Sequence, residues 1–136
     1  MRQKGFATLE VILMVMIIGI LASIAVPRFT SVTTAANTAK IQSDLATIDT
    51  AISIYYMEHG SYPTTLNQMS EYLQGVDSSN TTLKPPSGKC YLNGGTTAAA
   101  VPATEYTIQA ESGNNPARAI CGTGNTADKF YIPKKT

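Results

Sequence analysis

The sequence predicts an α+β fold in which one long N-terminal helix packs, through its second half, on a small antiparallel β-sheet head. Three observations carry this prediction. Phe6 to Pro27 is a mainly apolar run whose only charge is Glu10, and apolar residues between Ile41 and Tyr55 recur every three or four positions. After Gly60 the chain holds only short strand-like segments separated by Gly, Asn and Pro. The 136 residues allow one domain of ordinary size and exclude a large multidomain enzyme.

The composition excludes several classes of function. Ten Lys and Arg stand against nine Asp and Glu, a formal charge of +1, so duplex nucleic acid is not the expected partner. Cys90 and Cys121 fit one disulfide in an oxidising compartment but not a four-ligand metal set, and His59 is the only histidine. No nucleophile and base can be paired. We therefore expect neither an enzyme nor a cofactor or metal site.

The first element is the apolar run of 22 residues from Phe6 to Pro27. A helix of this length is about 33 Å long, close to the thickness of the hydrocarbon core of a bilayer. Arg2 and Lys4 precede the run and Arg28 follows it. The positive-inside rule then keeps the short N-terminal flank in the cytoplasm and places the rest of the chain outside.

Three interpretations of this run compete. It is a secretory signal peptide with Val11 to Leu21 as its apolar region and cleavage after Ala25, or a plain membrane anchor, or a segment in which Glu10 has a partner. A carboxylate buried in lipid costs about 2.5–3.5 kcal/mol unless something pairs with it. Only the third interpretation explains Glu10.

The string Lys4-Gly5-Phe6, followed by Glu10 and an unbroken apolar stretch, resembles the signal of type IV prepilins and pseudopilins. The resemblance implies that a prepilin peptidase cleaves between Gly5 and Phe6 and methylates the new N-terminus. It also makes Glu10 the fifth residue of the mature chain. The intervening Ala7-Thr8-Leu9 departs from the commoner Thr-Leu-Ile, but Phe6 and Glu10 keep their register.

Cleavage exposes an α-amine on Phe6, with an unperturbed pKa of about 7.7–8. The first and fifth residues of a helix lie on one face, so Glu10 can neutralise the amine of its own chain or of an adjacent subunit. An apolar array with one such pair per subunit assembles in one stagger, because other registers leave buried charge unpaired. Glu10 is therefore predicted to act in assembly.

Gly19 and Pro27 match the helix-breaking positions of the same family. Gly weakens a helix by about 1 kcal/mol and Pro by about 3 kcal/mol. Pro27 either begins a second helix or kinks a continuous one, and the resemblance favours the kink. It further implies that the segment from Gly19 to Pro27 can lose helical hydrogen bonds in a filament.

The second half of the helix is amphipathic. The segment from Phe29 to Lys40 is rich in Thr, so its intrinsic helix propensity is low. Beyond it, apolar residues spaced by 4, 3, 4 and 3 form one stripe, predicted to be the core of the head: Ile41, Leu45, Ile48, Ile52 and Tyr55. Gly60 is the predicted stop. A helix from Phe6 to Glu58 is about 80 Å long, so its first half must lie in lipid or against other subunits.

The head after Gly60 begins with a short helix from Leu66 to Leu73, whose Thr65 and Gln68 are spaced as a capping box. Four strands are then predicted: Lys89 to Leu92, Thr104 to Glu111, Ala117 to Cys121 and Lys129 to Ile132. If Cys90 and Cys121 are bonded they stabilise the head by roughly 3–4 kcal/mol. The alternative is two buried free thiols.

The sequence thus divides into a leader (1–5), a membrane and filament-core helix (6–28), an amphipathic helix half (29–59) and a globular head (60–136). The expected function is that of a structural subunit of a type IV pilus-like filament. Alternatives are a pseudopilin of a type II secretion or competence DNA-uptake system and a secreted binding protein cut after Ala25.

The partners that the resemblance implies are copies of the chain itself, prepilin peptidase, an inner-membrane assembly platform and minor pilins. Membrane lipid surrounds the helix before assembly, and nucleic acid is a partner only of a DNA-uptake filament. The expected location is the cytoplasmic membrane, with the head outside, and then an extracellular filament or an envelope pseudopilus.

Overall fold

A computed structural model describes residues 3–77, 79, 81–92 and 96–122. Its first element is helix α1, Gln3–His59, of 57 residues. The chain divides into two units, residues 1–33 and residues 34–136, which are described separately below. The long helix and the small antiparallel head confirm the predicted α+β fold.

The first unit is apolar and uncovered. From Leu9 to Val26, the large apolar side chains each expose 50–64% of their surface, and Phe6 exposes 74%. The helix that holds this segment is long and apolar enough to cross a membrane. Pro27 lies inside α1, so it does not begin a second helix.

The second unit has its core on the predicted stripe. Ile41, Leu45, Ile48 and Ile52 are at most 1% exposed, and Tyr55 is half-buried against them. Residues from the head close over this face of α1: Leu66, Met69, Leu73, Val76, Cys90, Tyr106, Ala117, Ala119 and Cys121. The helix ends where Gly60, with φ of 68°, donates its backbone N–H to Tyr56. The predicted stop is confirmed.

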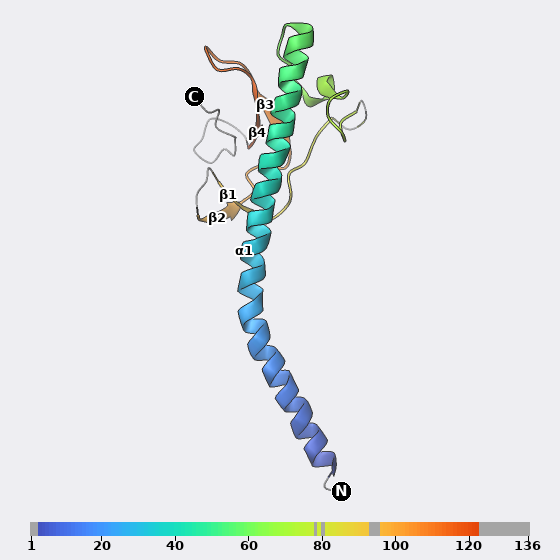
Figure 1. Cartoon of the computed structure of the whole chain (residues 1–136), viewed down its shortest axis with the longest axis vertical. Coiled ribbons are helices and arrows are strands. Elements are labelled where there is room, and N and C mark those ends of the chain that lie inside the picture. The colour runs from blue at the N-terminus through green and yellow to red at the C-terminus, as the bar shows by residue number, and fades with distance from the viewer. Residues whose placement is uncertain (1–2, 78, 80, 93–95, 123–136) are drawn as a thin grey trace. The chain divides into compact units, whose positions relative to one another are not determined.

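The head has two antiparallel pairs of strands along the C-terminal half of α1 (Figure 1). β1, Lys89–Tyr91, pairs with β2, Ala98–Ala100. β3, Tyr106–Gln109, pairs with β4, Arg118–Cys121, so that Tyr106 lies opposite Cys121. Three of the predicted strands are thus present in shortened form, whereas β2 was not predicted.

The predicted short helix is a single 3₁₀ turn, η1, Leu66–Met69. The side-chain oxygen of Gln68 accepts the backbone N–H of Thr65, as the capping box predicts, and also that of Thr64. The chain does not continue as an α-helix to Leu73, so that prediction was wrong in type and length. The predicted strand from Lys129 to Ile132 lies outside the described residues.

Candidate functional site

The predicted processing and assembly residues all lie on the exposed part of α1. Phe6 and Glu10 are four residues apart and share a face of the helix. Glu10 is exposed and forms no ion pair with any residue that the structure describes. A Cβ added at Gly5 or Gly19 would meet nothing within 4 Å. Packing within the chain therefore does not require glycine at either position.

Around Pro27, two hydroxyl side chains bond back to carbonyls of the helix itself. Pro27 has no N–H, so the carbonyl of Ser23 lacks its usual helical donor. The hydroxyl of Ser23 donates to the carbonyl of Ile20 at 2.7 Å, and that of Thr30 donates to the carbonyl of Val26 at 3.0 Å. Such bonds back to the helix commonly accompany bending. They place two side-chain donors on the turns beside Pro27.

In the second unit, polar residues of α1 fix the first pair of strands. The amide nitrogen of Asn37 donates to the carbonyls of Ser87 at 3.2 Å and Lys89 at 3.0 Å. The hydroxyl of Thr38 accepts the backbone N–H of Tyr91 at 2.9 Å. The edge of β1 that faces α1 is therefore bonded to the helix.

Two aspartates of α1 fix the second pair of strands. The hydroxyl of Tyr106 donates to Asp44 at 2.8 Å, and the backbone N–H of Ala119 donates to Asp49 at 2.7 Å. Burial and this bond to Asp44 raise the pKa of Tyr106. Lys40 pairs with Asp44 at 3.1 Å. Neither aspartate belongs to the apolar stripe that the sequence predicts, and its helical spacing gives them no role. The sequence offers one indication of their role: Asp44 directly precedes Leu45 and Asp49 directly follows Ile48, so both lie next to buried positions of the stripe.

Cys90 and Cys121 are both free and fully buried in the core of the head. Burial raises the pKa of Cys90. Burial, and next the nearby Cys90, raise the pKa of Cys121 to about 11, while a backbone hydrogen bond from Ala103 acts in the opposite direction. The two thiols therefore lie close enough to interact. No bond joins them in this structure, and the Cys90–Cys121 disulfide stays a prediction.

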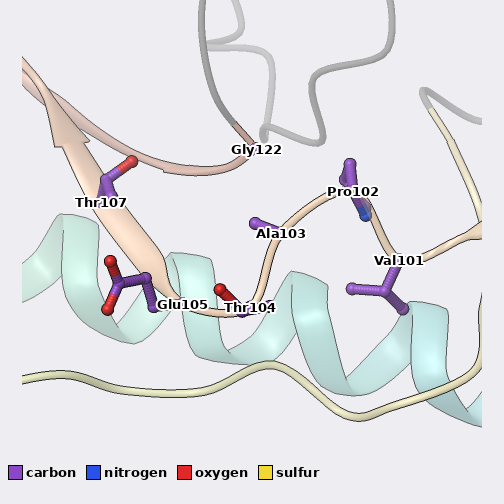
Figure 2. A pocket seen from close by; sticks show the side chains of 7 residues that line it. All are labelled: Val101, Pro102, Ala103, Thr104, Glu105, Thr107 and Gly122. Carbon is purple, nitrogen blue, oxygen red and sulfur yellow. The ribbon is translucent and has the colours of Figure 1, made fainter.

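A pocket of about 330 Å³ lies beside the segment that links β2 to β3 (Figure 2). It is lined by residues 101–105, Thr107 and Gly122. Glu105 is the only ionisable side chain among these lining residues. Among the described residues, no group of three His, Cys, Asp or Glu is arranged to hold a metal ion. The pocket presents no pair of groups that could act as nucleophile and base.

A group of tyrosines lies at the C-terminal end of α1, and three of them, Tyr55, Tyr62 and Tyr72, are partly buried against the core of the head. The rings of Tyr56 and Tyr62 stack with centroids 4.4 Å apart, and Tyr55 stacks on His59 at 4.1 Å. Among the described residues of the second unit, Tyr56 and Met57 are the only large apolar side chains that are exposed. We call the group of Tyr55, Tyr56, Met57, Tyr62 and Tyr72 the tyrosine patch, of which only Tyr56 and Met57 are exposed.

Carboxylates border the tyrosine patch. The hydroxyl of Tyr72 donates to Glu58, and this bond, burial and the charges of Glu58 and Glu71 raise the pKa of Tyr72 to about 12. Burial, then Tyr56 and the charge of Glu111, raise the pKa of Tyr62. Glu58, Glu71 and Glu111 form no ion pair with a described residue. The patch is therefore both apolar and acidic.

Together, these features define a class: a protein with one uncovered apolar helix segment, an amphipathic continuation of that helix, and a small β head bonded to it. Comparison with known proteins identifies the family within this class. The chain is 35% identical over 95 residues to type II secretion system core protein G of Aeromonas hydrophila, and the match covers 69% of this chain and 62% of that one. It is 33% identical over 94 residues to the protein of the same name from Vibrio cholerae, covering 69% and 60%.

A third relative is the type IV narrow pilus major component PilA5 of Thermus thermophilus, 41% identical over 64 residues, or 47% of this chain and 55% of that one. The chain thus matches less than two thirds of the length of each of these relatives. No family model and no solved structure matches the sequence. The protein belongs to the type IV pilin and pseudopilin family, as the N-terminal signal indicated.

Proposed function

We propose that the chain is a structural subunit of a helical filament, polymerising through the N-terminal part of α1. The observation that carries this proposal is the uncovered apolar surface from Leu9 to Val26, whose large apolar side chains are each at least half exposed. Such a surface is stable in lipid or against other apolar helices. The subunit itself needs no active site, and the proposal treats it as a non-enzyme.

Assembly in this proposal depends on Glu10 and on processing at the leader. Cleavage after Gly5 by a prepilin peptidase, with methylation at Phe6, would place an amine one helical turn from Glu10. Intact-mass measurement of the protein from membranes or filaments tests this step. The expected mass is that of the chain without its first five residues and with one added methyl group. A mature N-terminus at Val26 would instead support a secreted protein cut after Ala25.

Replacement of Glu10 tests the pairing directly. Glu10→Ala leaves the amine of Phe6 without its partner in an apolar array, and Glu10→Gln keeps the shape but removes the charge. We expect both variants to be processed and to lose filament formation. Glu105 is an exposed carboxylate of the head, so Glu105→Gln serves as the matched control and should assemble normally. Normal filaments from Glu10→Ala would contradict the assembly role.

The filament is either a type IV pilus or the pseudopilus of a secretion system. Relatives named as type II secretion system core protein G favour the second, and the pilus component from Thermus thermophilus favours the first. Both forms require an inner-membrane platform and minor subunits as partners. Microscopy at native expression separates them, because long surface filaments indicate a pilus. Loss of protein secretion on deletion, without surface filaments, indicates a pseudopilus.

A further inference from the structure

The exposed apolar surface of α1 continues beyond Val26. Phe29 and Val32 expose 69% and 63% of their surface, compared with at most 64% for the large apolar side chains from Leu9 to Val26. Val26, Phe29 and Val32 follow one another at intervals of three residues in one helix, so they are neighbours on its surface. The apolar face therefore extends past Arg28, and no described residue covers the extension.

Lipid does not account for this extension. Counted from Phe6, which cleavage would make the first residue, Phe29 lies 23 residues and Val32 lies 26 residues along the helix. At about 1.5 Å per residue these separations are about 35 and 39 Å, whereas the hydrocarbon core of a bilayer is about 30 Å thick. With Phe6 at one surface of the hydrocarbon core, both side chains would lie among hydrated headgroups, where they gain little from burial.

The polar side chains beside Phe29 and Val32 do not oppose burial of this turn. The three hydroxyl side chains next to them donate to carbonyls of the helix itself, at 2.9–3.0 Å: Thr30, Ser31 and Thr33. An apolar partner would therefore leave no hydroxyl donor of this turn unsatisfied. Residues 29–39 also carry no charged side chain. The segment thus suits an apolar partner better than a charged one.

We propose that Phe29 and Val32 bind the apolar segment of α1, between Leu9 and Val26, of a second copy of the chain. This inference rests on the proposed function and extends its interface beyond the part of the helix that lipid can cover. The observations favour a second copy because the extension is uncharged and continuous with the surface of the proposed polymerisation. The two side chains would meet headgroups in the membrane and apolar side chains in the filament, so their burial would favour assembly.

Truncation of the two side chains separates assembly from membrane retention. Phe29→Ala with Val32→Ala keeps the helix, because Ala has the highest helix propensity. We expect this double variant to stay in the membrane and to raise the critical concentration for assembly at least about tenfold, since two large apolar side chains would no longer be buried. Met57→Ala is the matched control, because it removes an apolar side chain of the same helix that is 75% exposed, and it should assemble normally.

Three results of the truncation experiment would overturn the inference. The double variant could assemble as well as the unmodified chain, or Met57→Ala could weaken assembly as much as the double variant does. The double variant could also be lost from the membrane, which would assign Phe29 and Val32 to lipid. Failure of the unmodified chain to form filaments would instead overturn the proposed function, so the two failures are distinguishable.

Photochemical cross-linking locates the partner without removing apolar surface. In the variant Phe29→p-benzoyl-phenylalanine, irradiation joins the ring to C–H bonds that it contacts. We expect irradiated filaments to yield dimers in which position 29 is joined to the segment from Leu9 to Val26 of the other copy. Cross-links from position 29 only to the head of another copy, or to no other chain, would overturn the inference.

Discussion

Replacing Tyr106 by phenylalanine removes one hydroxyl from the contact between β3 and α1. That hydroxyl donates to Asp44 at 2.8 Å in a partly buried position. Hydrogen bonds to charged groups contribute about 1.5–3 kcal/mol. Asp44 keeps its ion pair with Lys40 at 3.1 Å in the variant, and its side chain is 27% exposed. The loss of stability should therefore lie at the low end of this range. We expect Tyr106→Phe to lower the free energy of unfolding by about 1.5 kcal/mol at pH 7.

The same variant has a pH signature. Burial, the bond to Asp44 and the charge of Asp44 raise the pKa of Tyr106 above its ordinary value of 10.0. The folded protein therefore holds the phenolic proton to a higher pH than the unfolded chain. The contribution of Tyr106 is fully present below pH 10 and is lost as the pH rises above it. The stability difference between unmodified and Tyr106→Phe protein should shrink over that range.

Urea unfolding of the full chain in detergent micelles, followed by circular dichroism at pH 7, 9, 10 and 11, measures both effects. Tyr91→Phe is the matched control, because no described hydrogen bond is made by the hydroxyl of Tyr91. It should change stability by less than about 0.5 kcal/mol. Equal stability of Tyr106→Phe and the unmodified protein at pH 7, or a difference that stays constant to pH 11, would refute the assigned role of the Tyr106–Asp44 bond.

Two further predictions concern the core. Ile48→Ala, at a fully buried position of the stripe, should cost about 3 kcal/mol in urea unfolding, whereas Ser53→Ala on the exposed face should cost less than about 0.5 kcal/mol. For the cysteines, reduced protein should lose roughly 2 kcal/mol as the pH rises from 9 to about 11, because burial raises the pKa of Cys121 to about 11. Oxidised protein with a Cys90–Cys121 bond should lack that loss and be about 3–4 kcal/mol more stable, and identical pH curves for the two would contradict the pairing.

The helix and its stripe were predictable because their signal is local. The spacing from Ile41 to Tyr55 is periodic over four turns, and Gly60 supplies a positive φ at the end. β2 was missed because Ala98–Ala100 has no β-branched or aromatic residue, so its own propensity gives no sign of a strand. It forms through pairing with β1. The helix predicted from Leu66 to Leu73 was too long, because a capping box predicts where a helix begins but not where it ends.

The hydrogen bonds that hold the head to α1 could not be predicted from the sequence, for a different reason. Asp44 binds a residue 62 positions away and Asp49 one 70 positions away. A polar residue beside an apolar stripe is usually solvated, so helical periodicity alone classes both aspartates as surface. Their role depends on which strand packs over the stripe, and that follows from tertiary pairing.

The tyrosine patch was missed for the same reason. Tyr62 and Tyr72 approach α1 only after the chain has turned at Gly60, so their stacking and hydrogen bonding to Tyr56 and Glu58 leave no periodic signal. Only the folded chain shows which of these tyrosines are packed against the core and which are exposed.

The free energy available from covering the apolar half of α1 is large compared with the stability of a small domain. Full burial of a large aliphatic side chain contributes about 1.5–3 kcal/mol. The large apolar side chains from Leu9 to Val26 are 50–64% exposed, so covering them is worth on the order of 10–20 kcal/mol. That equals or exceeds the whole stability of a small domain, about 5–15 kcal/mol. Lipid and the bundle of identical helices that we propose would both recover this energy, so one sequence would suit both environments, and Glu10 would be the residue whose burial cost differs between them. A carboxylate unpaired in lipid but paired in the bundle would favour the assembled state over the membrane without any change in the head.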